Sequence, residues 1–377
     1  MVGTGLRTLV VGAGIGGLAV ARALRLAGHR PEVVERLPES TVGGSGIYLP
    51  GNASRALRQL GLHEPLRPFG APISRQRFLT ADGAELFEAD VDRLWEGIGE
   101  CRAVSRADLH QVLLSGAGGD VRYDTAVVDL QIVDSSAKVV FTDGTSAEYD
   151  LVIGADGRRS RVRVLAGLGS EPRPTGRISY RHVFASKAGI ATWTALLGDG
   201  VSLVVMPVAP GRLYAVLTEA GGEPDGGSGT PTAPPDPAAR FRELLAAFRG
   251  PAVAELASAA AVPAAVGEEV LARAWSAGPV VLLGDAAHAC SPTLSQGAAM
   301  ALEDAVVLAE ELRTAGSVRA ALAAYQARRV PRTTWVHERT ARWERCLDLP
   351  PSERDPHLRR HGAGEFRADH VALLDNL

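Results

Sequence analysis

Residues 6–35 read LRTLVVGAGIGGLAVARALRLAGHRPEVVE: a short apolar run, a glycine cluster, an amphipathic segment and a second apolar run. This order predicts a strand, a tight turn, a helix and a second strand. Gly12, Gly14 and Gly17 occupy the G-x-G-x-x-G positions directly after the first strand. Glycine there permits the turn and a close approach of the helix to the strand. We therefore expect a βαβ unit at the start of an α/β protein.

The glycine turn predicts a binding site for a dinucleotide. The amides from Ala13 to Gly17 lie in the first turn of the expected helix, where unpaired N–H groups and the helix dipole favour a pyrophosphate. Glu35 follows the second strand, and a carboxylate at that position accepts hydrogen bonds from ribose hydroxyls. A glycine-rich turn without a ligand is the alternative. A signal or membrane segment is argued against by the glycines and by Arg7, Arg22 and Arg25.

The composition excludes several classes of partner. The net charge of -3 and the lack of a basic block argue against nucleic acid and against an anionic membrane surface. Cys101, Cys290 and Cys346 are odd in number and far apart, so neither a disulfide framework nor a zinc or other metal site is expected. A reducing cytoplasm fits this pattern. The glycine stretch lies so close to Met1 that no cleavable targeting segment is expected.

The middle of the chain predicts a second sheet. Short alternating segments occur in the first quarter of the chain, and four apolar segments lie within residues 177–218. An antiparallel sheet is the economical interpretation. The Gly- and Pro-rich stretch 219–237 predicts a surface loop. Residues 318–345 predict a helix that is interrupted near Pro331, and the polar end beyond Pro350 specifies little structure.

Two later segments place a carboxylate at the end of a buried strand. Residues 150–163 read DLVIGADGRRSRVR, and residues 278–304 read GPVVLLGDAAHACSPTLSQGAAMALED. Each contains an apolar run of the type found in parallel sheets, followed by a glycine, an aspartate and a helix start. Because ligands bind at the carboxyl ends of parallel strands, Asp156 and Asp285 are candidate ligand contacts. The helix that starts near Gln296 presents amides and a positive dipole end.

These three motifs, in this order, resemble the fingerprints of the class A flavoprotein monooxygenases, the family of para-hydroxybenzoate hydroxylase and salicylate hydroxylase. The first is the glycine turn, the second is D-G-x-x-S-x-V-R at residues 156–163, and the third is G-D-A-A-H followed by P-x-x-x-Q-G-A at residues 284–298. The resemblance spans residues 6 to about 332. The family usually has glycine where Ser295 stands, and its arginine before the loop at residues 43–47 is not evident in this sequence.

The resemblance implies an α/β (α+β) fold. A Rossmann-like FAD-binding domain with a parallel sheet would be interleaved with an antiparallel-sheet substrate domain and followed by C-terminal helices. The FAD-binding domain is expected from residues 1–72, 100–175 and 265–316, the substrate domain from residues 73–99 and 176–264, and the C-terminal helical segment from residues 317–377.

The resemblance also implies FAD as the bound cofactor and NADPH or NADH as the electron donor. Glu35 would bind the adenosine ribose with Arg36 beside the adenine, and Arg106 would lie near the flavin. Asp156 and Arg163 would serve both nucleotides. Amides at the third motif would face the pyrimidine edge of the flavin, which becomes negative on reduction. The residues expected to contact the cofactor are Gly12, Ala13, Gly14, Ile15, Gly16, Gly17, Glu35, Arg36, Gly46, Arg106, Val128, Asp156, Arg163, Asp285, Pro292, Ser295, Gln296, Gly297, Ala298 and Ala299.

In the implied reaction, NAD(P)H reduces FAD, molecular oxygen forms a flavin hydroperoxide, and one oxygen atom passes to a small aromatic or similarly electron-rich substrate. No acid, base or nucleophile on the protein is required, so no catalytic residue is assigned. Tyr180, His182 and Tyr214 are candidates for the substrate pocket, the first two because residues i and i+2 of a strand share a face. His288 is interpreted as stabilising its turn rather than as a proton carrier.

Other functions remain open on this fold, because the fold does not set the chemistry of the pocket. They are a flavin epoxidase, a Baeyer-Villiger-type oxygenase, a reductase of the geranylgeranyl type and a non-catalytic FAD-binding subunit. A nicotinamide dehydrogenase would explain the first motif but not the two later ones. The expected partners are a small-molecule substrate and molecular oxygen, without nucleic acid or membrane, in a monomer or small homo-oligomer.

Overall fold

A parallel sheet is built around the glycine-rich stretch, as the sequence predicts. In this computed structural model, β1 (Thr8–Val11) pairs in parallel with both β2 (Glu32–Val34) and β11 (Leu151–Gly154). Beyond β11 lies β18 (Val280–Leu282), also parallel, and the short β17 (Ser276–Ala277) forms an antiparallel edge. The structure describes residues 5–39, 45–169, 171–220, 232–259 and 261–374.

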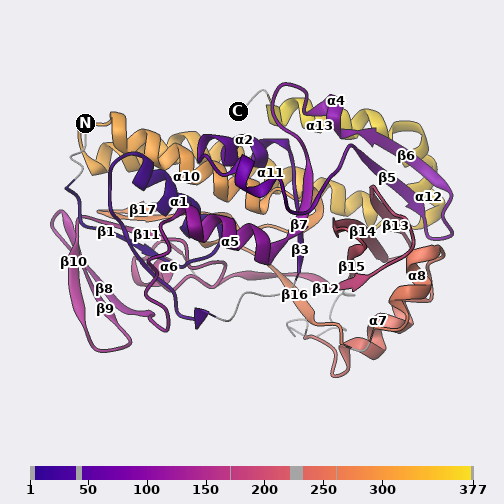
Figure 1. The fold of residues 1–377 in the computed structure, drawn as a ribbon, viewed down its shortest axis with the longest axis horizontal. Coiled ribbons are helices and arrows are strands. Elements are labelled where there is room, and N and C mark those ends of the chain that lie inside the picture. Colours follow the sequence, from indigo (N-terminus) through magenta and orange to yellow (C-terminus); the bar gives the residue numbers. More distant parts are fainter. Residues whose placement is uncertain (1–4, 40–44, 170, 221–231, 260, 375–377) are drawn as a thin grey trace.

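Helices cover one side of the parallel sheet, and a small antiparallel sheet lies on the other (Figure 1). On the helical side, α1 (Ile15–Leu26) contacts both α5 (Arg106–Gly116) and α10 (Gly297–Thr314), and α10 also contacts α2 (Gly51–Gln59). The strands of the small sheet are β8 (Val127–Val133), β9 (Ser136–Phe141) and β10 (Ser146–Tyr149).

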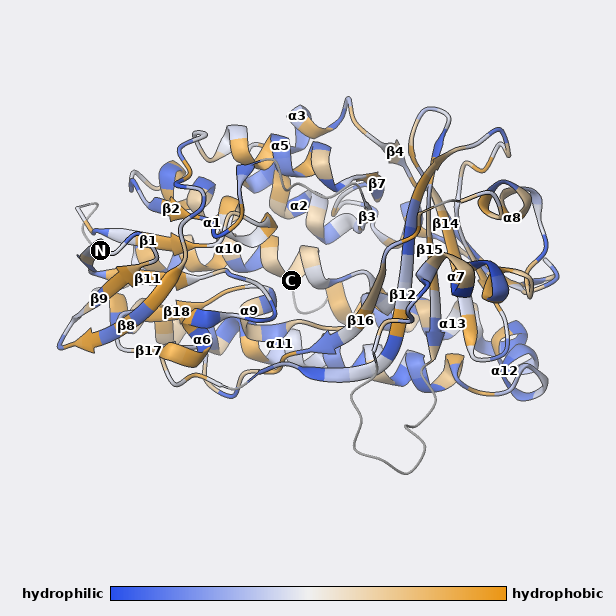
Figure 2. Ribbon diagram, turned by 90° about the horizontal axis from the view of Figure 1, so that it is seen from below, coloured by the Kyte–Doolittle hydropathy of each residue, from blue (hydrophilic) through white to orange (hydrophobic). Residues whose placement is uncertain are grey.

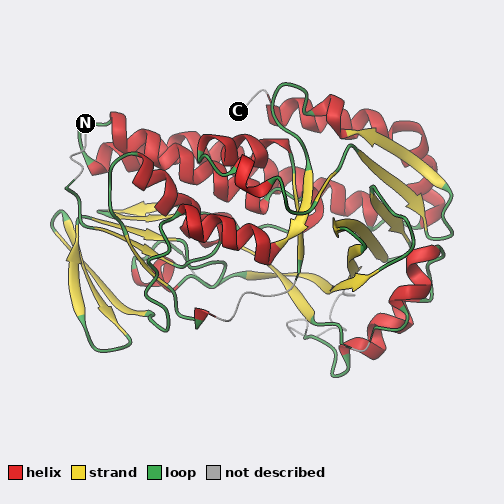
Figure 3. Ribbon diagram, viewed as in Figure 1, coloured by secondary structure: helices red, strands yellow, loops and turns green. Residues whose placement is uncertain are grey.

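A second, larger sheet occupies the other half of the molecule (Figure 3). Its strand order among the described residues is β16-β12-β15-β14-β13-β5-β6. The sheet was expected to be antiparallel, and most neighbouring strands are, but β13 and β5 run parallel. These two strands come from distant parts of the chain, so no hairpin fixes their relative direction. The strands are β5 (Arg75–Thr80), β6 (Glu85–Asp90), β12 (Arg173–Ala185), β13 (Trp193–Leu197), β14 (Val201–Ala209), β15 (Arg212–Ala220) and β16 (Ala264–Glu269).

The edge strand β16 lies in this sheet although the sequence places residues from 265 onward in the FAD-binding domain. It pairs antiparallel with β12, with Ala265 opposite Ser179. Its sequence, AAVGEE, shows no alternation of apolar and polar residues, so the strand is not evident from the sequence. Pairing with β12, rather than local preference, defines it.

A third sheet joins the two halves. Its order among the described residues is β3-β7-β4, and β14 of the large sheet contacts both β4 and β7. The remaining short elements are placed around it and around the parallel sheet. These elements and the strands of the third sheet are β3 (Gly46–Leu49), β4 (Ala71–Pro72), β7 (Arg102–Ser105), α3 (His63–Leu66), α4 (Val91–Leu94), α6 (Arg161–Leu165), α9 (Asp285–His288) and a 3-10 turn (Pro292–Leu294).

The outer face of the large sheet is covered by α7 (Pro237–Leu245) and α8 (Pro251–Leu256). Tyr180 and Phe241 belong to the hydrophobic cluster between them and the sheet. Figure 2 shows apolar residues concentrated on the strands of both halves. Because α7 and α8 cover the outer face of the large sheet, its inner face is the one that can border a cavity.

The C-terminal third of the chain is more ordered than the sequence indicates. The helix α11 (Val318–Leu347) continues through Pro331, so the expected interruption is wrong. Arg329 and Arg332, on either side of the proline, are buried in ion pairs that hold both turns in place. Beyond Pro350 two further helices follow, α12 (Pro351–His357) and α13 (Ala363–Leu374), joined by a π-helical turn.

The expected loop at residues 219–237 lies largely outside the described residues, because these omit 221–231. Of the two ends of this segment, Glu219 lies in β15 and Pro237 is the first residue of α7. In the part of the chain that the structure describes, no helix combines the length and apolarity needed to cross a bilayer.

Candidate active site

A cavity of about 490 Å³ lies between the parallel sheet and the inner face of the large sheet. On one side it is bordered by the glycine turn, by the chain just after β11 and β18, and by the turn that leads into α10. On the other side it is bordered by β12, β15, β14 and β13. The cavity thus begins at the carboxyl ends of the parallel strands, where α/β folds bind ligands.

The glycine turn is shaped by close backbone contacts. A Cβ on Gly17 would lie 1.8 Å from the carbonyl oxygen of Gly12, and a Cβ on Gly12, whose φ is +105°, would lie 2.5 Å from the carbonyl oxygen of Ala155. Gly14, by contrast, has no atom within 4 Å of a Cβ position and faces the cavity. No side chain caps the N-terminus of α1, and its first turn holds no acidic residue. These features fit a pyrophosphate bound to the amides of α1.

Glu35 is held against this turn. Its carboxylate accepts hydrogen bonds from the amides of Ala13 (2.8 Å) and Leu37 (3.0 Å). The carbonyl of Ala13 also lies 2.9 Å from Nε2 of His110, a contact that the sequence does not reveal. The carboxylate of Glu35 therefore holds the glycine turn in place. The side chain of Arg36, the next residue, is exposed.

The second motif forms a support behind the cavity. The carboxylate of Asp156 accepts hydrogen bonds from the hydroxyl of Ser160 (2.5 Å) and from the amides of Arg161 (2.7 Å) and Val162 (3.1 Å), so it holds the start of α6. Burial raises the pKa of this carboxyl, and the hydrogen bonds oppose that shift. Its oxygens are thus engaged with the chain, whereas the sequence expectation has them facing the cofactor.

Arg163 is likewise turned inward. It is 1% exposed, and its guanidinium donates to the carbonyls of Ala286 (2.8 Å) and Arg158 (2.7 Å). It therefore ties the start of α6 to α9. Neither Arg163 nor Asp156 lines the cavity, so their contact with a bound nucleotide stays a prediction.

A second helix N-terminus opens into the cavity from α10. No side chain caps it, and Gly297 and Ala298 line the cavity there. Ser295, just before it, has a φ of +54° and a ψ of +26°, the left-handed conformation. For a residue other than glycine this conformation costs about 1 to 2 kcal/mol. The turn keeps its shape despite the serine, with strain that a glycine would avoid.

A buried network lies directly behind this turn. Asn52 donates from Nδ2 to Gln296 (2.9 Å) and to Glu303 (2.8 Å). Glu303 also accepts from Arg332 (2.6 Å) and Arg329 (2.7 Å) of α11. Burial alone would raise the pKa of Glu303, but the two arginines outweigh it and lower the pKa.

Asp304 continues this network to α9. It accepts hydrogen bonds from Arg329 Nε (2.7 Å) and from the amide of Gly284 (3.0 Å), and it lies 2.6 Å from Nε2 of His288. Burial opposes ionisation of Asp304, yet His288 and Arg329 hold its pKa at about 2. His288 thus has the turn-stabilising contact that the sequence predicts. The sequence analysis does not identify the other residues of this network. The two acidic residues in the apolar helix α10 are the signal that points to it, because buried charges are usually paired.

The substrate candidates divide between the two faces of the large sheet. Tyr180 and His182 share a face, as predicted, but it is the outer one. Tyr180 is fully buried, donates its hydroxyl to Glu219 (2.6 Å) and packs on Phe241. His182 stacks on Phe184. Neither lines the cavity described here, which Ser179 and Arg181 of the same strand do.

Tyr214 does line the cavity, from β15. Its ring packs against Gly46 of β3, where a Cβ would lie 2.5 Å from the ring. Burial raises the pKa of its hydroxyl, while Arg181 and Arg106 act in the opposite direction. Arg181, which lies between Tyr180 and His182 in β12, faces the cavity instead of them.

The predicted cofactor contacts therefore fall into two groups. Those that line the cavity are Gly14, Ile15, Gly16, Arg106, Asp285, Pro292, Ser295, Gly297 and Ala298. Those outside its lining are Gly12, Ala13, Gly17, Glu35, Arg36, Gly46, Val128, Asp156, Arg163, Gln296 and Ala299. Most of the second group support the first from behind, whereas Val128 is 41% exposed on β8.

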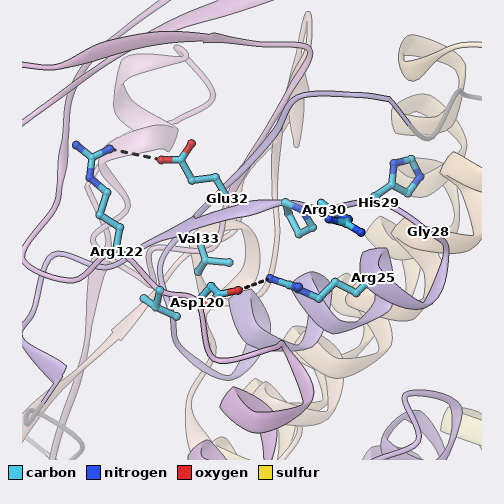
Figure 4. Close-up of a pocket in the computed structure, with 10 residues that line it drawn as sticks. Arg25, Gly28, His29, Arg30, Glu32, Val33, Asp120 and Arg122 are labelled. Atoms are coloured by element: carbon cyan, nitrogen blue, oxygen red, sulfur yellow. Dashed lines mark hydrogen bonds and ion pairs between the residues drawn. The ribbon is translucent and has the colours of Figure 1, made fainter.

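A second depression lies on the surface at the start of β2 (Figure 4). Four of its charged side chains form two ion pairs: Arg25 lies 3.7 Å from Asp120, and Arg122 lies 3.4 Å from Glu32. Glu32 begins β2, so this depression is at the amino end of the strand, away from the glycine turn. It has neither the helix N-termini nor the apolar wall of the cavity.

Comparison with known proteins agrees with this geometry. The FAD binding domain family matches residues 6–340. The chain belongs to the class A FAD-dependent monooxygenases. This monooxygenase is 34% identical over 343 residues to the aurachin C monooxygenase/isomerase of Stigmatella aurantiaca, covering 87% of this chain and 86% of the relative. It is 35% identical over 382 residues to the 3-amino-4-hydroxybenzoate 2-monooxygenase of Streptomyces cremeus, covering 95% of this chain and 93% of the relative.

A solved structure shares the whole fold. Klebsiella pneumoniae HpxO complexed with FAD and uric acid matches this monooxygenase with a TM-score of 0.86 and 25% sequence identity, over 98% of this chain and 97% of that chain. The protein is thus an oxidoreductase that binds FAD. The open space above Gly14 and the two uncapped helix N-termini in one cavity are what this cofactor requires.

Proposed function

We propose that this monooxygenase catalyses the NAD(P)H- and oxygen-dependent hydroxylation of a small aromatic or similarly electron-rich compound. The observation that carries the proposal is the continuity of one cavity, which runs from two uncapped helix N-termini to a sheet face that bears Tyr214. Relatives named for urate, 3-amino-4-hydroxybenzoate and 3-hydroxybenzoate support an aromatic ring as the substrate.

In this proposal the cofactor is held mainly by backbone groups. The amides at the start of α1 bind the pyrophosphate, and Glu35 lies beside the adenosine ribose. The amides of Gly297 and Ala298 face the pyrimidine edge of the flavin, where the dipole of α10 favours negative charge. FAD, once reduced by NAD(P)H, supplies the electrons that activate molecular oxygen for transfer to the substrate.

The protein orients the substrate on the opposite wall. Because burial raises the pKa of Tyr214, its hydroxyl stays protonated at neutral pH and can donate a hydrogen bond to a substrate oxygen. The surrounding wall of Phe78, Trp193, Val204 and Met206 is apolar and excludes water from the reacting ring. The three cysteines are free, which supports the reducing cytoplasmic compartment expected from the sequence.

A turnover experiment tests the proposal. FAD-loaded protein is screened with aromatic compounds for faster NAD(P)H consumption without release of hydrogen peroxide, and the product is analysed after reaction under labelled oxygen. One labelled oxygen atom in the product is the expected result. Turnover without incorporation of label would favour a reductase, and FAD binding without turnover across a broad panel would favour a binding subunit. Colourless protein that fails to take up FAD would contradict the proposal altogether.

A further inference from the structure

The segment between α9 and α10 runs along the cavity. Every residue from Cys290 to Ser295 lines it, and the segment leads directly into the uncapped N-terminus of α10. A hydrogen bond from the amide of Ser295 to the carbonyl of Pro292 (2.8 Å) closes its single 3-10 turn. A turn this short has few bonds of its own. Side chains from other elements therefore help to fix where it lies.

Glu344 of α11 binds this segment at two points. Its Oε1 accepts hydrogen bonds from the hydroxyls of Ser291 and Thr293, the latter at 2.9 Å. The Nε of Arg177 in β12 lies 3.3 Å from the same oxygen. Three donors therefore converge on one oxygen of a carboxylate whose side chain is only 17% exposed. Hydrogen bonds to a charged acceptor are stronger than those between neutral groups.

The hydroxyls of Ser291 and Thr293 serve the turn, although both side chains line the cavity. A hydroxyl has one proton to donate, and an ionised carboxylate can only accept. Both protons are thus directed to Glu344. The two side chains then hold the turn to α11 and have no proton left to donate to a ligand.

A second contact from α11 holds the start of the same segment. Nε2 of His337 lies 3.1 Å from the carbonyl oxygen of His288, at the end of α9. His337 and Glu344 are about two helical turns apart, so they lie on one face of α11. The segment is therefore attached to this helix both before and after Cys290.

Asp348 shares one partner with Glu344 but does not contact the turn. It follows the last residue of α11, and both of its oxygens accept hydrogen bonds from Arg177 (2.6 Å each). Within the described part of the chain, no hydrogen bond joins its side chain to residues 290–295. The two carboxylates thus allow an ion pair with β12 to be separated from a hold on the turn.

We propose that Glu344 is a positioning residue for the N-terminus of α10. Through Ser291 and Thr293 it fixes the turn, and the turn fixes the amides of Gly297 and Ala298 where they stabilise negative charge on the reduced flavin. When this hold is lost, the reduced cofactor loses more stabilisation than the oxidised one. This inference rests on the function and the flavin position proposed above, and it adds a residue that lies outside the three motifs.

FAD binding in the absence of substrate tests the assignment. The dissociation constants of oxidised and reduced FAD and the midpoint potential are measured for Glu344→Ala and the wild type. We expect the affinity for reduced FAD to fall about tenfold relative to that for oxidised FAD, which lowers the potential of the two-electron couple by about 30 mV. Glu344→Gln keeps an acceptor oxygen and should retain most of the wild-type potential. Thr293→Val removes one hydroxyl from the turn and should shift the potential in the same direction by a smaller amount.

Asp348→Ala is the matched control, because it removes a partner of Arg177 without touching the turn. It should leave the potential unchanged. An unchanged potential in Glu344→Ala, or an equal shift in Asp348→Ala, would overturn the assignment, since a merely structural role lowers stability without moving the potential. If Glu344→Ala does not fold, Thr293→Val decides, and an unchanged potential in that variant overturns the assignment. Because no substrate is present, this outcome is distinct from failure of the hydroxylase function, which the turnover experiment measures.

Discussion

The two walls of the cavity are built by different means. On the cofactor side the shape comes from the backbone, with Gly12 and Gly17 in contacts that exclude a Cβ and with two helices that begin without a side-chain cap. On the substrate side it comes from alternate side chains of a sheet, such as Arg181 and Tyr214. Where the backbone forms the wall, the required glycines appear as a motif in the sequence. Where side chains form the wall, the residues that line it depend on which face of each strand is turned toward the cavity.

The largest expected effect tests the backbone-built wall. Gly17→Ala places a Cβ 1.8 Å from the carbonyl oxygen of Gly12, so the glycine turn must open. We expect a loss on the order of 3 to 5 kcal/mol in the free energy of unfolding, together with loss of FAD, measured by chemical denaturation and flavin absorbance. Gly364→Ala, in α13 with nothing within 4 Å of the new Cβ, should retain both. Equal behaviour of the two variants would contradict the steric argument.

A similar effect is expected from the network that supports this wall. Arg329→Met leaves Glu303 and Asp304 buried with one cation fewer. Breaking a buried pair in this way typically costs about 3 to 5 kcal/mol. Its neighbour Arg328, exposed and paired with Glu310 and Glu311, provides the control, since Arg328→Gln should cost less than about 1 kcal/mol. Urea unfolding of the two variants separates them.

The same network predicts a dependence of stability on pH. The folded pKa of Asp304, about 2, lies below the value of about 3.9 in an unfolded chain. Its contribution is therefore fully present above pH 4 and is lost as the pH falls toward 2, by about 2 kcal/mol. Unfolding free energies measured between pH 6 and acid conditions should fall in the wild type. A fall of the same size in Asp304→Asn would show that other carboxyls are responsible.

The side-chain wall is tested by a pair of tyrosines on opposite faces of the large sheet. Tyr214→Phe removes a hydroxyl from the cavity, so we expect weaker substrate binding with little change in stability. Tyr180→Phe removes one of the two partners of buried Glu219, which keeps its ion pair with Arg240, so we expect a loss of about 1 to 2 kcal/mol in stability and unchanged substrate binding. Substrate titration measures binding and chemical denaturation measures stability in both variants. The reverse pattern would mean that the outer face borders the substrate.

The smallest effect concerns the one strained residue of the backbone-built wall. Ser295→Gly relieves the left-handed conformation, and the gain is offset in part by the greater freedom of glycine in the unfolded chain. We expect a net stabilisation of about 0.5 to 1 kcal/mol, seen as a higher midpoint of thermal unfolding in the FAD-free protein. A lower midpoint would show that the serine side chain contributes more than its backbone conformation costs.

These contrasts explain what the sequence predicts well. The parallel sheet, the glycine turn, the position of Glu35 and the start of α10 follow from local requirements, since each residue type is dictated by the backbone around it. The fold and the cofactor are recognisable for the same reason. Ser295 departs from the glycine that the resemblance implies at this position, and its positive φ is a conformation that glycine adopts without strain.

Other features depend on partners far away in the chain. A shift of one residue moves a strand side chain to the opposite face, which is why Tyr180 and His182 are assigned to the cavity in place of Ser179 and Arg181. The strand β16 exists because β12 offers it a partner. The buried arginines on either side of Pro331 hold α11 together through contacts with α10, which no local pattern in α11 indicates.

The length of α11 has a structural consequence. Its 30 residues form a rod of about 45 Å. Its middle is hydrogen-bonded to α10 behind the turn at Ser295. Glu344 near its end accepts hydrogen bonds from Ser291 and Thr293, and Trp343 and Leu347 line the cavity. One helix therefore contacts both walls of the cavity, in a part of the chain that carries no motif.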